Sequence, residues 1–327
     1  MLVISCTLAR IFVLLMMSVY PAAGEKISSQ QPPPTVTVTA DRMAGDSSSS
    51  SQQRWSIPCS NQYQETTPHP GCSPVQGGPC DRRVVDDFLS TTEVEQLLRM
   101  AQTGMALAPT TSIVGSTKVN VNTGWVMAPE TGSTHPIYTT GHHFYSQAEY
   151  VLYHTVRERL KTLVEHTFAV TPGALHFTAP TFFTRAVGGH PPWQPTILQD
   201  EYWHLHSDKN NTDHYDFSGL IYLSTYGLHF HGGGHLEFYN ASSTSVECST
   251  VGTTSVHQAS PCVVSGPPDL IVEPRQGRAV VFGSGRENPH RVTRVQTGTR
   301  YVLAFWFSCD PQRQFPQLLD GKAHQTV

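Results

Sequence analysis

The sequence has few charged residues and no surplus of basic ones. Asp, Glu, Lys and Arg make up 14% of the 327 residues, and the net charge is -4. Proteins that bind nucleic acid usually present a basic face, so the composition does not favour nucleic acid as a partner. No internal repeat is visible, so repeat arrays are not indicated. The length suits one large domain with a sizeable core, or two small ones.

Two motifs of zinc proteins are also missing. The sequence contains no Cys-x-x-Cys pair, so a structural zinc site is not indicated. It contains no His-Glu-x-x-His motif, so a zinc hydrolase of that type is not indicated either. Beyond the first residues, no apolar run reaches the roughly 20 residues that a membrane-spanning helix needs.

Residues 1–24 have the pattern of a secretory signal peptide. Arg10 precedes the apolar run Ile11–Val19, and Pro21–Gly24 supplies small residues for cleavage. Because Arg10 is the only charge in this stretch, an uncleaved signal anchor stays open, as does a chance apolar start. We therefore expect the protein in the secretory pathway, in the lumen of the endoplasmic reticulum. The alternative is a single-pass membrane protein whose main domain is lumenal, with no other membrane contact.

Cysteine usage agrees with an oxidising compartment. Apart from Cys6 in the leader, the number of cysteines is even and compatible with three disulfides, although buried free thiols stay open. These cysteines are Cys59, Cys72, Cys80, Cys248, Cys262 and Cys309. Cys248 and Cys262 are the first expected pair, because they bracket one Ser/Thr-rich segment. Sequons at Asn210-Asn211-Thr212 and Asn240-Ala241-Ser242 could carry glycans, so a glycoprotein is expected.

Composition divides the rest of the chain in two. Residues 25–80 contain Pro32–Pro34 and the tract Ser47–Ser51, and they lack apolar periodicity. We predict a low-complexity stalk there, with its cysteines tied down by disulfides. Residues 81–327 form the expected main domain. A capping box at Ser90–Glu93 predicts a helix that ends near Gly104, and apolar spacing predicts a second helix over residues 146–168.

Short apolar runs that are punctuated by glycine and proline follow the second helix. They predict strands at residues 175–177, 181–186, 201–206, 217–224, 234–239, 269–272, 279–282, 290–295 and 301–307. Many short strands after two helices indicate an α+β fold that is mainly β. The expected architecture is a double-stranded β-helix, or jelly roll, backed by helices.

Three His-x-acid triplets are candidate metal-binding pairs. They are His206-Ser207-Asp208, His214-Tyr215-Asp216 and His235-Leu236-Glu237. A chain with 17 histidines produces such pairs by chance, so their context must decide. His206 ends an apolar run, whereas His214 lies in a polar stretch and His235 follows three glycines. We therefore favour His206 and Asp208, whose side chains point the same way if they alternate along a strand.

A third ligand must come from a distant segment, and His290 is the candidate. Two histidines and one carboxylate are the facial triad of non-haem Fe(II) oxygenases, which leaves three coordination positions open. Arg300 follows ten residues later, and a turn at residues 296–298 could bring its guanidinium back to the metal pocket, where it suits a carboxylate. His204, Tyr202, Trp203, Tyr222 and Trp306 are candidate pocket-lining residues, and each is also a plain core candidate.

The same order of motifs resembles the prolyl 4-hydroxylase class of 2-oxoglutarate and iron(II)-dependent dioxygenases over about residues 82–310. It is most similar to the secretory-pathway subgroup named for its 2-oxoglutarate and iron-dependent oxygenase domain. The segments that carry the resemblance are Asp86–Ser90, Ala179–Arg185, Asp200–Lys209, Glu273–Phe282, His290–Val292 and Gly298–Tyr301. Collagen-type enzymes have Lys where this chain has Arg300, so proline is not carried over as the substrate.

The resemblance implies a dioxygenase that incorporates O2 and uses Fe(II), 2-oxoglutarate and ascorbate. His206, Asp208 and His290 would hold the iron, and Arg300, with Tyr202 and Tyr222, would hold the 2-oxoglutarate. A peptide or protein is the expected substrate. The catalytic domain of this protein would be lumenal. Two alternatives stay open: a catalytically silent jelly-roll binding module, and a cupin-type metal enzyme that does not use 2-oxoglutarate.

Overall fold

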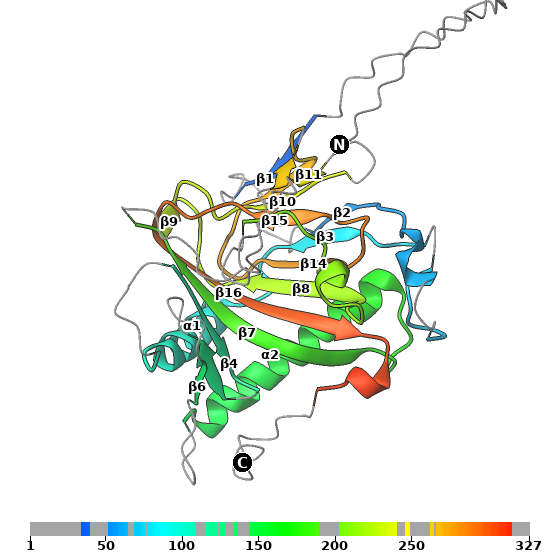
Figure 1. Ribbon diagram of the computed structural model, residues 1–327. Coiled ribbons are helices and arrows are strands. Elements are labelled where there is room, and N and C mark those ends of the chain that lie inside the picture. The colour runs from blue at the N-terminus through cyan, green and yellow to red at the C-terminus, as the bar shows by residue number, and fades with distance from the viewer. Residues whose placement is uncertain are drawn as a thin grey trace, which may run out of the picture. The chain divides into compact units, whose positions relative to one another are not determined.

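Figure 1 shows the path of the chain in the computed structural model. The structure describes residues 34–39, 52–64, 69–75, 78–108, 115–122, 124–127, 134–136, 144–189, 203–240, 246–248, 262–264 and 266–315. All of these belong to one unit, Pro34–Val327. The leader expected at residues 1–24 and the pocket candidate Tyr202 lie outside the described residues.

Two helices form where the sequence predicts them. Helix α1, Thr91–Met105, begins after Ser90, whose hydroxyl accepts a hydrogen bond from the amide of Glu93, while the Glu93 carboxylate accepts one from the amide of Ser90. Helix α2, Gln147–Phe168, begins with the same kind of reciprocal pair at Ser146. Such pairs satisfy amides that have no partner within the helix. Among the described helices, none is long and apolar enough to cross a membrane.

The described residues are mainly β. The larger sheet contains β2 Gln52–Trp55, β3 Arg82–Val85, β4 Gly115–Asn120, β5 Trp125–Met127, β6 Thr134–Pro136, β7 His176–Val187, β8 Phe217–Tyr222, β9 Phe230–His231, β14 Ala279–Gly283 and β16 Thr297–Ser308. Their order is β2-β3-β14-β8-β16-β7-β4-β5-β6, and β9 pairs separately with β16. The expected runs at 175–177 and 181–186 are therefore parts of the single strand β7.

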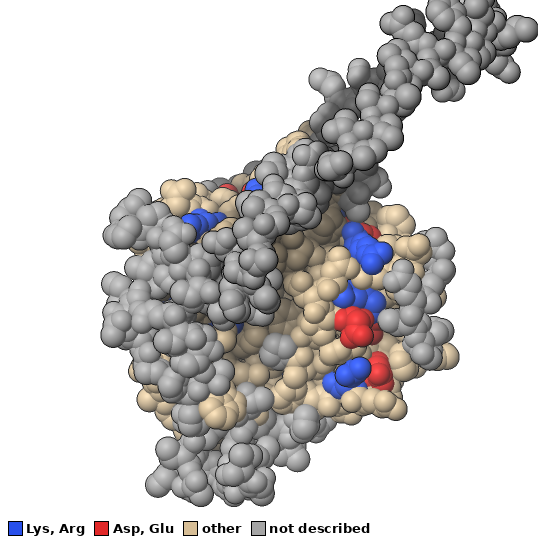
Figure 2. Space-filling view, in the orientation of Figure 1, with Lys and Arg blue, Asp and Glu red and all other residues tan. Residues whose placement is uncertain are grey.

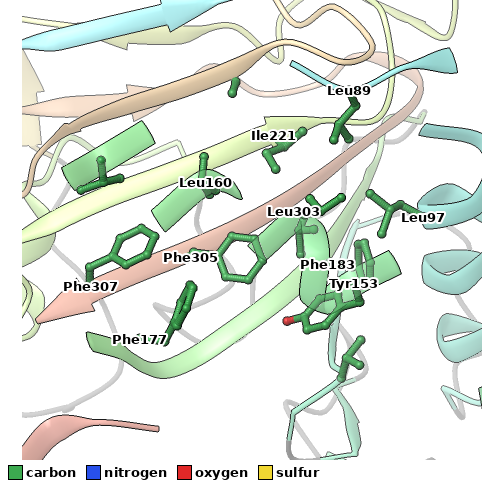
Figure 3. Close-up of a cluster of buried hydrophobic side chains, with 14 of the residues drawn as sticks. Leu89, Leu97, Tyr153, Leu160, Phe177, Phe183, Ile221, Leu303, Phe305 and Phe307 are labelled. Atoms are coloured by element: carbon green, nitrogen blue, oxygen red, sulfur yellow. The ribbon is translucent and has the colours of Figure 1, made fainter. Parts of the chain in front are cut away.

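One face of this sheet packs against the two helices. Because side chains alternate along a strand, Leu303, Phe305 and Phe307 of β16 turn to the helix side, where they join Leu160 of α2 and Leu97 of α1 in a buried cluster. Figure 3 shows part of this cluster. Burial of each such side chain contributes about 1.5–3 kcal/mol. The residues of β16 that lie between these three face the opposite side of the sheet.

A smaller sheet packs against that opposite face. It contains β1 Val36–Val38, β13 Leu270–Val272, β10 Leu236–Phe238 and β15 His290–Val292, in that order. A second buried cluster joins the two sheets, with Phe238 and Leu270 from the small sheet and Phe282 and Val302 from the large one. The site described below lies at the edge of this second cluster.

Parts of the expected stalk are built into the domain. Strand β1 pairs in parallel with β13, and β2 pairs with β3. Disulfides join Cys59 to Cys80 and Cys72 to Cys309. Residues 34–39, 52–64, 69–75 and 78–80 contribute edge strands and loops that bury only scattered residues such as Val38 and Cys59, so they lack apolar periodicity and composition alone does not reveal them.

Cys248 and Cys262 are directly opposite each other in a separate two-stranded ribbon. Its strands are β11, Val246–Cys248, and β12, Cys262–Val264. The backbone register agrees with the pairing expected from the sequence, and the disulfide itself stays a prediction.

Candidate metal centre

His206, Asp208 and His290 come together at one point of the fold. One ligand atom from each lies within 4.8 Å of the other two, and no other group of three such residues forms within the part of the chain that the structure describes. The Nε2 atom of His206 lies 3.6 Å from one Asp208 oxygen, and Nε2 of His290 lies 3.8 Å from the other. Three donors converging in this way can bind one metal ion.

Local structure differs here from the expected strand. Only His206 shows β-type pairing in residues 203–206, through an isolated bridge to His290. Asp208 opens a short helix, α3, Asp208–Asn211. The prediction that His206 and Asp208 alternate along one strand is therefore wrong at Asp208. The turn into α3 brings its carboxylate beside the imidazole of His206 instead.

Hydrogen bonds fix the tautomer of both histidines. Nδ1 of His206 lies 3.0 Å from the carbonyl oxygen of His204, and Nδ1 of His290 lies 3.0 Å from that of Asn288. A carbonyl oxygen only accepts, so each Nδ1 carries the proton and donates it. Each Nε2 then presents a lone pair toward Asp208, which is the form that binds a metal.

The protonation states of Asp208 and His290 suit a metal cation. Burial alone would raise the pKa of Asp208, but the two histidines and the hydroxyl of Ser218, which donates to Oδ2 at 2.5 Å, lower it overall. Burial lowers the pKa of His290 to about 4, against the opposing charge of Asp208. Burial acts the same way on His206, but its hydrogen bond and proximity to Asp208 raise its pKa overall.

The two other His-x-acid triplets do not form such a site. The Nε2 atom of His214 forms a hydrogen bond with the hydroxyl of Thr178. The Asp216 carboxylate accepts hydrogen bonds from the Lys209 ammonium at 3.0 Å and from the amide of Cys309. Glu237 receives hydrogen bonds from the guanidinium of Arg291 and the hydroxyl of Tyr239. Both acids therefore have structural partners.

The three residues open onto a cavity of about 780 Å³ between the sheets. Its wall on the large sheet comes from alternate residues of β16, namely Arg300, Val302, Ala304 and Trp306, with Phe305 beside them. The face of the molecule shown in Figure 2 is hollowed near its centre, and charged side chains gather along one side of the hollow. The candidate His204 also lines the cavity.

Arg300 lines the same cavity as the three candidate donors and is buried, with only 4% of its surface exposed. Its Nε donates to the carbonyl oxygen of Gly234 at 2.9 Å, and its guanidinium lies 5.4 Å from the ring centre of Tyr222. The Tyr222 hydroxyl is buried, and the Arg300 guanidinium is its charged neighbour. Burial raises the pKa of Tyr222, so this hydroxyl stays a proton donor. A buried cation beside a buried donor suits the carboxylate of a bound acid.

Arg300 reaches this place by a different route from the expected hairpin. His290 is in β15 of the small sheet, and Arg300 is in β16 of the large one. The connection between them therefore crosses from one sheet to the other. Gly234, with φ of +80°, helps to hold Arg300, because a Cβ there would lie 2.4 Å from Phe230 and 3.2 Å from Cδ of Arg300.

Several residues of the site were not anticipated from the sequence. They are Ser116, Lys118, Asn120, Trp125 and Met127, which lie on β4 and β5 and line the cavity. The alternation of Lys118 and Asn120 with Val119 and Val121 is the one signal that could have predicted a strand there. Ser218, which orients Asp208, has no comparable sequence signal.

The part of the chain that carries this site matches a known protein family. Residues 194–308 match the family model described as the 2OG-Fe(II) oxygenase superfamily. This segment is similar to 2OG-Fe(II) oxygenase domains. It contains all four of His206, Asp208, His290 and Arg300. The family implies Fe(II) and 2-oxoglutarate, and the expected enzyme class, an oxidoreductase of the dioxygenase type, is confirmed.

The similar proteins agree with the resemblance stated from the sequence. The chain is 28% identical over 270 residues to 2-oxoglutarate and iron-dependent oxygenase domain-containing protein 3 of Xenopus tropicalis, covering 80% of this chain and 72% of that protein. A 41-residue stretch is 54% identical to prolyl 3-hydroxylase 1 of Gallus gallus, which is 12% of this chain and 6% of that one.

A solved structure also aligns with the chain. It is a prolyl hydroxylase from Trichoplax adhaerens in complex with a hypoxia inducible factor peptide fragment. The alignment has a TM-score of 0.40 and 16% identity, and it covers 71% of this chain and 85% of that one.

Proposed function

We propose that this protein is a 2-oxoglutarate- and Fe(II)-dependent dioxygenase that hydroxylates a peptidyl side chain in the secretory pathway. The observation that carries the proposal is the opening of His206, Asp208, His290 and Arg300 onto one cavity. Two packed sheets backed by helices support the further proposal that the fold is the double-stranded β-helix, or jelly roll, expected from the sequence.

Each residue of the site has a defined task. The Nε2 atoms of His206 and His290 and the Asp208 carboxylate would hold Fe(II), and the hydrogen bonds from Ser218 and to the His204 carbonyl keep the donors aimed at one point. When bound together, Fe(II) and 2-oxoglutarate supply O2 activation coupled to the release of CO2 and succinate. Ascorbate would serve as the reductant that keeps the iron in its active state.

The charge of Arg300 indicates where the carboxylate of the co-substrate would bind. Arg300 would pair with the carboxylate of 2-oxoglutarate that is remote from the metal, and the Tyr222 hydroxyl would donate to the same group. Both groups are buried, so water competes little for the contact. The hydrogen bond from Arg300 to the Gly234 carbonyl fixes the plane of the guanidinium before the acid arrives.

The shape of the cavity supports an extended peptide as the substrate. Val302, Thr184, Lys118 and Met127 are neighbours across β16, β7, β4 and β5, and all four line the cavity. Three strand spacings make this row about 14 Å long, the length of about four residues of extended chain. Prolyl 3-hydroxylase 1, whose name states a prolyl substrate, shares a short stretch with this chain and also favours a peptidyl target.

The proposed location rests on separate observations. Two disulfides within the described residues suit an oxidising compartment such as the lumen of the endoplasmic reticulum. The apolar leader at residues 1–24 supports entry into that compartment, by cleavage or as an anchor.

A product analysis tests the proposal. The protein is incubated with Fe(II), 2-oxoglutarate, ascorbate, isotopically heavy O2 and a peptide library drawn from secreted proteins, and the products are analysed by mass spectrometry. We expect one heavy oxygen atom in a peptide side chain and one in succinate. Heavy succinate without any labelled peptide would contradict the peptidyl substrate and retain the dioxygenase. Neither product would contradict both.

A further inference from the structure

Two residues of the expected stalk contact both chain segments that carry the metal donors. Gln62 and Tyr63 lie in the short 3-10 helix η1, Asn61–Gln64, directly after Cys59. We name residues 207–211, which contain Asp208, the Asp208 segment, and residues 283–290, which end in His290, the His290 segment. Neither Gln62 nor Tyr63 falls within residues 194–308, the span of the family match.

Gln62 bridges the two segments through its amide group. Its Nε2 donates to the side-chain oxygen of Asn210 at 2.8 Å, two residues beyond the donor Asp208. Its Oε1 accepts a hydrogen bond of 2.9 Å from the amide of Arg286, four residues before His290. One buried side chain therefore fixes one segment relative to the other, since only 7% of Gln62 is exposed.

Tyr63 bridges the same segments with its hydroxyl and its ring. The hydroxyl accepts from the amide of Gly285 at 2.8 Å and donates to Glu287 at 2.9 Å, both in the His290 segment. The ring lies 5.1 Å from the ammonium of Lys209 in the Asp208 segment, at cation–π range. Burial, followed by the charge of Glu287, raises the pKa of Tyr63, so its hydroxyl keeps its proton.

The two segments lead directly to the donor atoms. The amide of Lys209 donates to the carbonyl of Ser284, and the hydroxyls of Ser284 and Ser218 lie 2.7 Å apart, with Ser218 bonded to Asp208. At the other end, the carbonyl of Asn288 holds Nδ1 of His290. A shift of either segment would therefore move a metal donor.

We infer that Gln62 and Tyr63 are positioning residues for the metal centre, held in place by the Cys59–Cys80 disulfide. The inference rests on the metal site of the proposed function. Groups that orient metal ligands typically change metal affinity by 10- to 100-fold when they are removed. Gln62 and Tyr63 act one step further out, so their loss should weaken metal binding by about tenfold.

Co(II) titration of the full metal-free protein tests the inference, with the absorption of bound Co(II) as the signal. Tyr63→Phe keeps the ring and removes the hydroxyl, and Gln62→Ala removes the amide bridge. The matched control is Tyr145→Phe, because Tyr145 is as buried as Tyr63, each being 2% exposed, and its hydroxyl donates to the Met100 carbonyl in the core beside the helices. Hydrogen exchange at the amides of Lys209 and Gly285 provides a second measurement without metal.

The expected result is a Kd for Co(II) about tenfold higher in Tyr63→Phe and in Gln62→Ala than in the wild type, with faster exchange at Lys209 and Gly285. Tyr145→Phe should leave both unchanged. Equal Co(II) affinity in Tyr63→Phe, Gln62→Ala and the control would overturn the positioning role while leaving the metal centre intact. A wild-type protein that does not bind Co(II) would overturn the metal centre, and the positioning role with it.

Discussion

His206 and His290 bind each other through their backbones as well as converging through their side chains. The amide of His206 donates to the carbonyl of His290 at 3.0 Å, and the amide of His290 donates to the carbonyl of His206 at 2.8 Å. Residues paired in this way are directly opposite, with Cα atoms about 5.5 Å apart. The reciprocal pair joins two segments that are far apart in the sequence, and it brings both imidazoles close to the Asp208 carboxylate.

Arg300 should determine the affinity for 2-oxoglutarate. In Arg300→Gln the cation is lost from a buried site, and a charged hydrogen bond contributes about 1.5–3 kcal/mol, so the KM for 2-oxoglutarate should rise roughly 10- to 100-fold. Arg300→Lys keeps the charge but loses the hydrogen bond from Nε to the Gly234 carbonyl. Its KM for 2-oxoglutarate should therefore lie between those of the wild type and Arg300→Gln. Initial rates of succinate formation measure this. An unchanged KM in Arg300→Gln would show that another residue holds the acid.

Gly234→Ala should disturb the same site indirectly. Its positive φ and its contact with Phe230 and Arg300 leave no room for a Cβ. We expect a raised KM for 2-oxoglutarate together with a lower melting temperature. Gly227→Ala is a matched control, because Gly227 has nearly the same φ, +79°, and a Cβ there meets nothing within 4 Å. If both variants show the same KM, the close packing around Arg300 is not what places it.

Metal binding should depend on pH through one histidine. The raised pKa of His206 means that a proton competes with the metal as the pH falls through that value, whereas the pKa of His290, at about 4, and the lowered pKa of Asp208 keep those two groups ready to bind. Between about pH 6 and 5, the Co(II) Kd should therefore rise about tenfold for each unit by which the pH falls. A hundredfold rise per unit would mean that two protons compete, and would contradict this assignment.

The disulfide between Cys72 and Cys309 should stabilise the whole domain. It closes a loop with a sequence separation of 237 residues, and loss of such a constraint typically costs about 2–4 kcal/mol. Replacing both cysteines with serine should lower the free energy of unfolding by that amount in urea, with Co(II) affinity retained. Stability equal to that of the wild type would mean that this bond does not constrain the chain.

The sequence was sufficient for the parts of the site that depend on residue type. The pattern of His206, Asp208, His290 and Arg300 predicted a set that the structure brings to one cavity, and one capping box and one run of apolar spacing predicted the two long helices. The sequence was not sufficient where pairing between distant segments decides the local backbone structure. Asp208 lies in a helical turn rather than on a strand, because the backbone of His206 pairs with His290 and the chain then turns into α3.

The same limit explains why the structure of the N-terminal segments was not predicted. Three of the four residues of strand β2 are polar and exposed, so nothing in its composition predicts that it pairs with β3. Gln62 and Tyr63 are ordinary residues in a polar stretch, and only the fold shows that they contact Asn210 and Gly285. Substrate identity depends on loops around the cavity, where sequence patterns carry the least physical information.

Succinate formation from 2-oxoglutarate by the purified protein, with Fe(II) and ascorbate, tests the central claim most directly. The wild type should form succinate at least in slow turnover without substrate. His206→Ala should abolish it, because one of three metal donors is lost. His214→Ala should retain it, because His214 bonds to Thr178 and is not among the three donors. Succinate formation by both variants would contradict the metal assignment, and none by the wild type would favour a binding module.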